Sequence, residues 1–517
     1  MSKIKSLILG SAAVVAASAG AQAADLPVKA KAVQYVKICS LYGAGFYYIP
    51  GTDTCIRIGG HIRLDLGFNT ANTYDAPAYQ AGGTAAQSRT RDFYQTRTRI
   101  ALQTDTRTAT EYGVVRTFSD VKYEWANTRD NVAGGFTEVD YGFIQFAGFT
   151  FGKAVSNFDA PWLLAAPVIN SYTLGASNVS TGVTQIAYTA QFGNGVSGSL
   201  ALEDNRVYKR AGIYNTGLSL APLGSTQLPN YGTVPNTFTG NAESGTRVPD
   251  IVGNLRLDQA WGSFHVAAAV HEVVPSYYAN NGNTALALAT AQEANGNPNS
   301  KFGYAVSGAL ELKNLPTGPG DSLKMDVTYA KGAAKYVFGG TFDTLGGGRV
   351  ASFNSGTFAF GHIFDAVFGS TGTFNSANSQ LELSTSYGGR IFFEHYWNPQ
   401  WRTSAWAGIA RQEYNSNATA LLLASYGAGG ANRTAASGTV NITGGNFNMT
   451  LYQVGTTTSW QPVKDLTFSG EFTYGKVDQN LTGTYSTPLG GTQGRSGTFN
   501  LGDVNVYSGA LRVLRSF

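Results

Sequence analysis

Arginines at alternate positions are the residues whose types and spacing best suit chemistry on a solute. In CIRIGGHIRLDLGF (55–68) and RTRDFYQTRTRIALQT (89–104), the period of two puts the charges on one face of an extended segment. A guanidinium stays charged at any working pH, and neighbouring strands lie about 4.8 Å apart. We therefore expect one basic wall that filters and orients charged solutes. Its predicted members are Arg57, Arg63, Arg97 and Arg99, with Arg116 as a further member.

A structural role competes with this interpretation, because Asp65 and Asp105 lie close to the arginines and would pair with them. The pattern alone leaves both roles open. Three more charged residues are predicted to face the same interior. Arg390 and Glu394 alternate with apolar residues in LELSTSYGGRIFFEHYW, and Asp159 is the single acid of SNFDAPWLLAAPVINSYTLGASNV.

The sequence contains few motifs for enzymatic chemistry. Its five histidines form no HExxH pair, no GxSxG elbow occurs, and GFTFGK lacks the spacing and the Ser or Thr of a phosphate-binding loop. His265, His271 and Glu272 are close in sequence, but we favour polar residues of a channel wall over a metal site. The sequence therefore predicts no enzyme, no metal and no cofactor.

The first residues predict export. MSKIKSLILGSAAVVAASAGAQA has two lysines, a short apolar run and an A-x-A site, so 1–23 is a predicted signal peptide and the mature chain begins at Ala24. No later apolar run is long enough for a membrane-spanning helix, and mean hydropathy is −0.11. A helical membrane protein is thus excluded, whereas a barrel of alternating strands is not.

Composition narrows the class further. Charged residues are 13% of the chain, about half of the ordinary ~25%. Removing two signal lysines from a net charge of +4 leaves +2, which is too small to indicate a nucleic-acid partner. Few charges with abundant glycine and aromatics suit an outer surface that faces lipid. A secreted adhesin or β-solenoid would need a sequence repeat, and none is visible.

The two cysteines are Cys39 and Cys55. An even pair in an exported chain favours a disulfide over a zinc site, which would need more ligands. The bond would close a compact loop within a periplasmic-side segment, 24–54, ahead of the barrel.

Turn signals and polar stretches give the strand count. Seven short turns are predicted near Thr104, Gly148, Asn194, Gly262, Pro316, Pro399 and Pro462. They alternate with eight long polar loops at 69–89, 124–136, 156–182, 205–248, 274–300, 332–379, 415–446 and 477–502. Fifteen connections require sixteen strands. The sequence predicts no helices that would cover such a sheet.

The fold class predicted is all-β: a 16-stranded antiparallel transmembrane β-barrel over 55–517, with long extracellular loops and short periplasmic turns. Apolar faces then turn to lipid and the arginines to water. A gated transporter would need a larger barrel and a preceding plug domain.

Three stretches carry a resemblance to a known family. AADLPVKAKAVQYVKICSLYGAGFYYIPGTDTCIRIGGHIRLDLGF, FIQFAGFTFGK at 143–153 and the terminal LRVLRSF resemble the alphaproteobacterial (rhizobial-type) general porins. The resemblance implies a homotrimer in the outer membrane, in contact with lipid and lipopolysaccharide, whose third long loop (156–182) folds into the channel and narrows it. It implies passive diffusion of small hydrophilic solutes and ions.

Overall fold

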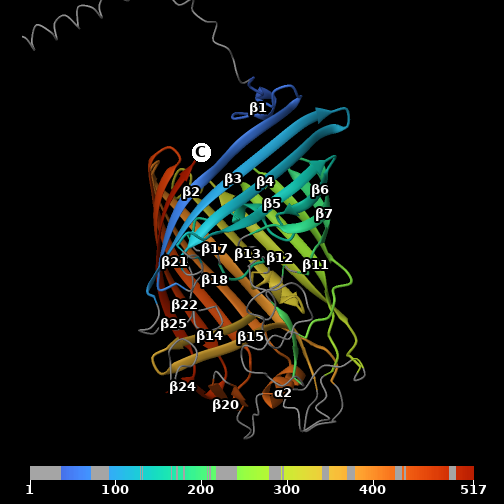
Figure 1. The fold of residues 1–517 in the computed structure, drawn as a ribbon, viewed down its shortest axis with the longest axis vertical. Coiled ribbons are helices and arrows are strands. Elements are labelled where there is room, and N and C mark those ends of the chain that lie inside the picture. Colours follow the sequence, from blue (N-terminus) through green and yellow to red (C-terminus); the bar gives the residue numbers. More distant parts are fainter. Residues whose placement is uncertain are drawn as a thin grey trace, which may run out of the picture.

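The computed structural model is a closed barrel with a second sheet at one end (Figure 1). The described residues are 37–70, 92–127, 130, 132–164, 166–169, 173–177, 181–206, 208, 211–216, 242–278, 293, 296–339, 348–369, 379–425, 433–435, 438–487 and 497–517. Within them, no helix has the length and apolarity needed to cross a bilayer. The predicted signal peptide lies outside this part of the chain.

Sixteen antiparallel strands of the described chain form the barrel, and the first pairs with the last to close it. They are β2 (Thr54–Phe68), β3 (Tyr94–Thr110), β4 (Gly113–Ala126), β5 (Phe136–Phe146), β6 (Phe149–Ala154), β7 (Val183–Gly193), β8 (Val196–Glu203), β10 (Asp250–Gln259), β11 (Gly262–Val273), β12 (Lys301–Lys313), β13 (Ser322–Lys331), β17 (Thr385–Asn398), β18 (Trp401–Glu413), β21 (Met449–Val463), β22 (Leu466–Gln479) and β25 (Val504–Ser516). The predicted fold class is confirmed.

Side chains alternate between the two faces as the period of two requires. On β2 the outward Ile62 is 51% exposed, whereas the next residue, Arg63, is 8% exposed and points inward. Ile58 and Leu64 are exposed like Ile62, and Asp65 is buried like Arg63. The apolar face of this strand is therefore the outer surface of the barrel.

Short turns and long connections alternate around the barrel. The short turns are 111–112, 147–148, 194–195, 260–261, 314–321, 399–400 and 464–465. Asn194 and Gly195 both have positive φ, 51° and 79°, which is the backbone of a tight two-residue hairpin. The predicted turn near Thr104 is wrong, because the threonine-rich segment continues as β3 and pairs with β2 and β4 up to the turn at 111–112.

A second sheet covers the end of the barrel that carries the long loops, at the bottom of Figure 1. It is built from strands inside those loops: β9 (Gly212–Asn215), β14 (Gly348–Asn354), β15 (Thr357–Phe368), β16 (Glu382–Leu383), β19 (Arg433–Ala435), β20 (Gly438–Gly444), β23 (Thr482–Thr487) and β24 (Gly497–Leu501). A helix, α2 (Ser416–Ser425), packs against β15. The expectation of a chain without helices is therefore wrong.

Strand β15 organises this second sheet. It pairs with β14, β16, β9 and β24, and nearly every residue of TFAFGHIFDAVF is buried. The strand lies within the predicted polar loop 332–379. A continuous apolar run of this length marks a fully buried strand, so this part of the loop is a core element.

Apolar packing fills the same half of the barrel along much of the wall. Buried small and apolar side chains of the wall from β7 to β25 pack there against residues of the connection between β13 and β17. The participants include Ala187, Ala201, Val252, Ala267, Ala269, Ala305, Ala330, Ala410, Leu451, Val477, Val504 and Val506 from the wall, with Tyr336, Val337 and Phe338 from the connection. Packed side chains therefore occupy part of the interior in this half of the barrel.

The N-terminal segment lies beside the end of β2 at the other end of the barrel, where the short turns lie (Figure 1). Cys39 and Cys55 form a disulfide, as predicted, across a sequence separation of 16. The short strand β1 (Tyr47–Tyr48) pairs with β2, and Phe46 packs against both cysteines. The segment is thus fixed to the start of the first barrel strand.

Candidate functional site: the interior of the barrel

The third long loop, 155–182, runs along the inner face of the barrel and is called L3 below. Its backbone is held by wall side chains: Glu471 accepts from the N–H of Ile169 at 2.5 Å, and Gln453 accepts from that of Leu174 at 3.2 Å. The Pro167 carbonyl accepts a bond from Ser404, and the Ile169 carbonyl one from Arg512. These partners lie on β18, β21, β22 and β25, far from the strands that L3 connects.

The start of L3 is bound to another part of the wall. Glu203 of β8 accepts from the Ser156 hydroxyl and the Asn157 N–H, both at 2.7 Å. Asn254 of β10 donates to the Asn157 carbonyl, also at 2.7 Å. L3 is therefore anchored at widely separated strands, and it lies inside the barrel.

A close approach of backbones fixes the loop at β17. Gly175 has φ +105°, and a Cβ placed there would lie 2.6 Å from the backbone of Gly389. Only glycine allows this contact at this backbone angle. L3 thus packs directly on the wall at this point.

Asp159, the predicted acid of this loop, is buried. Its two carboxylate oxygens accept from the Ser177 hydroxyl at 2.9 and 3.0 Å, which joins the two ends of L3. Burial raises the pKa of the Asp159 carboxyl from 3.8 to about 7, although the guanidinium of Arg390 and the Ser177 bond act in the opposite direction. Its role in the structure is to tie L3 together.

We expect the stability of the protein to depend on pH through Asp159. Between about pH 4 and about pH 7 the folded chain holds a proton that the unfolded chain has released. The contribution of this proton is therefore full below about pH 4 and is lost as the pH rises through about 7. In Asp159→Asn the thermal unfolding midpoint should change less between about pH 5 and about pH 8 than in the parent.

The matched control is Asp204→Asn in the next long loop, where the carboxylate accepts from the Arg206 N–H. This variant should keep the pH dependence of the parent. Equal pH dependence in Asp159→Asn and the parent would remove the role assigned to this carboxyl.

The mid-barrel arginines form a dense ion-pair network. Asp65 contacts Arg63 at 3.0 Å, Arg97 at 2.7 Å and Arg512 at 2.6 Å. Glu124 of β4 extends this network through ion pairs with Arg97, at 3.7 Å, and with Arg99. The Arg97 side chain is 1% exposed, so these cations are locked into the wall, and the pairing that competed with a filtering role is present.

A second group surrounds Asp105 near the short turns. Arg57, Arg107 and Arg116 approach this carboxylate at 3.8, 3.1 and 3.0 Å. Arg57 lies six residues before Arg63 on β2, which is about 20 Å along a strand. The predicted single basic wall is therefore two separate groups.

Arg390 and Glu394 both face the interior from β17. Arg390 pairs with Asp326 at 3.0 Å and donates to Thr173 of L3 at 3.1 Å, so it fastens the loop to the wall. Glu394 pairs with Arg402 at 3.1 Å nearer the short turns.

Sequence reasoning missed Arg512, Glu124, Lys122 and Asp326 as members of these networks. Between Asp120 and Val121 of β4, the pairing with β5 shifts from Tyr141 to Val139, so Asp140 is an extra residue on β5. Such a bulge breaks the period of two in β5, whereas β4 keeps it in its pairing with β3. Lys122 of β4 pairs with Asp140, the extra residue of the bulge. Alternation in the strands that hold Asp326 and Arg512 was the available signal for these two residues.

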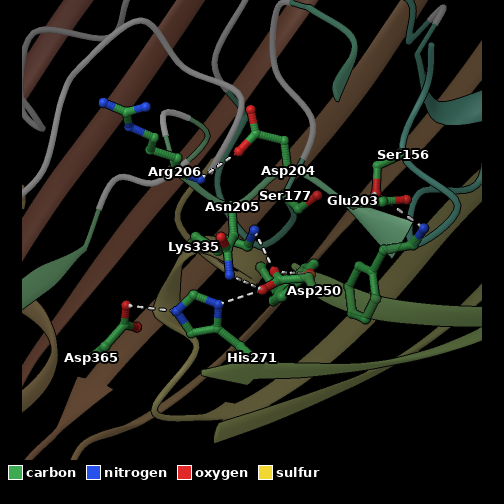
Figure 2. Close-up of polar contacts among 12 residues, drawn as sticks. Ser156, Ser177, Glu203, Asp204, Asn205, Arg206, Asp250, His271, Lys335 and Asp365 are labelled. Atoms are coloured by element: carbon green, nitrogen blue, oxygen red, sulfur yellow. Dashed lines mark hydrogen bonds and ion pairs between the residues drawn. The ribbon is translucent and has the colours of Figure 1, made fainter. Parts of the chain in front are cut away.

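A buried polar cluster joins the barrel wall to the connection between β13 and β17 (Figure 2). Asp250 contacts His271 at 2.7 Å and Lys335 at 2.6 Å, and it accepts from the Tyr336 hydroxyl at 2.6 Å. Asn205 donates to the same carboxylate at 2.7 Å. Burial and the nearby carboxylates raise the pKa of Tyr336 well above its usual value. The cluster holds the connection against the wall.

The histidines considered for a metal site do not converge. His271 pairs with Asp250 inside the barrel, whereas the adjacent Glu272 pairs with Arg247 at 3.0 Å. His265 lies beside Trp162 of L3. In the described part of the chain no three His, Cys, Asp or Glu side chains are grouped to hold a metal ion.

A closed sixteen-stranded barrel with an apolar outside, charged networks inside and a loop folded against its inner wall defines an outer-membrane channel of the porin class. Residues 25–509 match the family model described as "Porin subfamily", and the chain belongs to this family. It is a channel of the Gram-negative outer membrane and not an enzyme. The short-turn end is then the periplasmic end.

Two sets of known proteins are similar to the chain. Porin Omp2b of Brucella suis biovar 1 (strain 1330) is 33% identical over 286 residues, 53% of this chain and 68% of the relative, and Porin Omp2b of Brucella canis is 32% identical over 285 residues. The outer membrane channel DcaP of Acinetobacter baumannii shares the fold, with TM-score 0.54 and 13% identity over 91% of this chain and 99% of that one.

Proposed function

We propose that small hydrophilic solutes and ions cross this barrel by passive diffusion, through the space between L3 and the inner face of β2–β5. The observation that carries the proposal is the anchoring of L3 at both ends of its course inside the barrel, by Glu203 and by Glu471. A cluster of buried apolar side chains lies along the wall from β7 to β25 in the half of the barrel that carries the long loops. The charged face of β2–β5 is left to line the path, and L3 narrows it.

In this proposal the predicted lining residues form two groups, those with exposed side chains and those with buried, paired side chains. Arg57 and Arg116, with side chains 48% and 29% exposed, meet the solute directly. The paired residues set the field from within the wall or shape the path: Arg63, Arg97, Arg99, Arg390 and Glu394. Asp159 acts on the path through the shape of L3.

Export and assembly follow the family resemblance. Residues 1–23 are removed as a signal peptide, 24–54 stay on the periplasmic side, and three copies form a homotrimer. The outward tyrosines Tyr474 and Tyr507, whose ring centroids are 5.3 Å apart, belong to an aromatic belt at the membrane surface. Lipid and lipopolysaccharide surround this outer face.

The test is single-channel recording of the purified protein in planar bilayers with potassium chloride. We expect stepwise insertion of open channels whose current is proportional to voltage. Heat-modifiable gel mobility confirms that the barrel is folded in the same sample. Folded protein that gives no conductance would contradict the proposal.

A change at the glycine contact of L3 tests the role of the loop. In Gly175→Val the new side chain collides with the Gly389 backbone, and the φ of +105° disfavours any side chain. L3 must then move off β17 into the open space, so single-channel conductance should fall. Gly245→Val, where a Cβ would meet nothing within 4 Å, is the control and should conduct like the parent.

A further inference from the structure

Aromatic side chains face the interior of the barrel beside the Asp105 group. Phe118 of β4 pairs with Asp105 across β3 and with Phe143 across β5, so all three point inward. The two rings are stacked, with centroids 5.4 Å apart and an interplanar angle of 30°. Both are partly exposed and belong to none of the buried core clusters of the described chain. One side of this ring pair is therefore open to the interior.

Guanidinium groups alternate with these rings. Arg116 lies 5.4 Å from the centroid of Phe118 and 5.6 Å from that of Phe143. Arg107 lies 4.9 Å from the ring of Phe46, which belongs to the disulfide-closed segment. At these distances a cation and the face of an aromatic ring attract each other. The rings hold the guanidinium planes in place, and part of each guanidinium side chain stays exposed.

The group carries surplus positive charge and free donors. Asp105 is the single carboxylate that contacts Arg57, Arg107 and Arg116 in the described residues, which leaves +2. A guanidinium has five N–H donors; the hydrogen bonds seen for Arg107 use two and those for Arg116 use three. Their side chains are 28% and 29% exposed, in contrast to the buried cations at mid-barrel.

We propose that this surface, the mouth patch of Phe118, Phe143, Arg107 and Arg116, binds aromatic carboxylates at the periplasmic end of the channel. The proposal rests on the channel function and deepens it by naming a solute class. A carboxylate accepts paired hydrogen bonds from the edge of a guanidinium, and an aromatic ring of the solute packs offset on the exposed ring pair. An aliphatic carboxylate of the same size gains the first interaction and loses the second.

The probes are benzoate and cyclohexanecarboxylate, which carry the same charge and have similar volumes. Each is added to the periplasmic side of single channels at low salt, because screening weakens contacts of exposed charges. We expect benzoate to reduce the chloride current at concentrations roughly three- to tenfold lower than cyclohexanecarboxylate, since aromatic pairing contributes about this much.

Variants separate the rings from the charge. Phe118→Leu with Phe143→Leu should abolish the preference for benzoate while potassium chloride still passes. Arg116→Gln should weaken block by both probes equally. Lys313→Gln, a matched loss of one cation on β12 beside Glu311, should leave the preference intact. Phe118→Tyr keeps an aromatic ring and should also retain the preference for benzoate. If the double variant does not fold, each single leucine variant should reduce this preference.

Equal block by the two probes in the parent would overturn the proposal, and so would a benzoate preference that survives the loss of both rings. The channel function is judged separately by conductance in potassium chloride without either probe. Failure of the mouth patch therefore leaves a conducting channel without preference, whereas failure of the channel function leaves no current.

Discussion

Replacing Asp65 by Asn is expected to lower the free energy of unfolding by about 3–5 kcal/mol, because it leaves buried guanidiniums without their shared counter-charge. Asp65 is the carboxylate common to Arg63, Arg97 and Arg512. Arg97 keeps a distant contact with Glu124 at 3.7 Å, and the other two lose their ion pair. Denaturant titration in lipid vesicles measures the loss.

The control is the same substitution on an accessible pair. Asp478 contacts Lys476 at 3.4 Å, and both side chains are about one-third exposed. Asp478→Asn should cost at most about 1 kcal/mol, as for other exposed ion pairs. Equal costs for the two variants would mean that the Asp65 network is as well solvated as the surface, and that its cations are accessible after all.

The substitution Ile62→Lys is expected to lower the free energy of unfolding by about 1–2 kcal/mol, since it places a charge on the lipid-facing surface of the barrel. Ile62 lies on the outward face of β2, opposite Arg515 near the end of the last strand, so the charge enters the apolar band close to its edge. The same titration in vesicles applies, and the effect should be present at every salt concentration because it reflects transfer of charge into lipid.

Gln103→Lys on the adjacent strand gives the matched comparison. Gln103 points inward and donates to Asp120 at 3.0 Å, so a lysine there enters a polar interior beside a carboxylate. Its cost should be small. A larger cost for Gln103→Lys than for Ile62→Lys would reverse the assignment of inside and outside.

Most of the barrel could be predicted from the sequence because its two determinants are local. Alternation of polar and apolar residues marks each strand, and turn residues such as Asn194–Gly195 mark the hairpins. The exception near Thr104 shows the limit. Charged and hydroxyl residues there looked like a turn, yet pairing with strands on both sides keeps them extended.

The second sheet could not be predicted, since local pattern does not show what a loop packs against. TFAFGHIFDAVF becomes a buried strand because β9, β24 and α2 come from three other loops to cover it. The apolar run itself was visible in the sequence. Its partners are far away in the chain, and the alanines on both faces of β11 were the remaining hint of a packed interior.

The sequence predicted that arginines face the interior of the barrel, but it did not predict how they are arranged along the wall or with which residues they pair. Alternation correctly placed Arg63 and Arg97 on the inward face, but it gives no distance along the barrel between Arg57 and Arg63. It also gives no partner across the closure, where Arg512 reaches Asp65. Register between strands decides which charges meet, and the bulge at Asp140 of β5 shifts this register.

Closure of the barrel between β2 and β25 has a kinetic consequence. His61 pairs with Ser516, and Phe517 exchanges backbone hydrogen bonds with Gly60, so the contacts that complete the sheet join residues separated by nearly the whole chain. Contacts of such separation form slowly. Until they form, both edges carry unpaired N–H and C=O groups, which invite pairing with another chain. The two edge strands of the newly exported polypeptide are therefore open to pairing with other chains until the last strand joins the first.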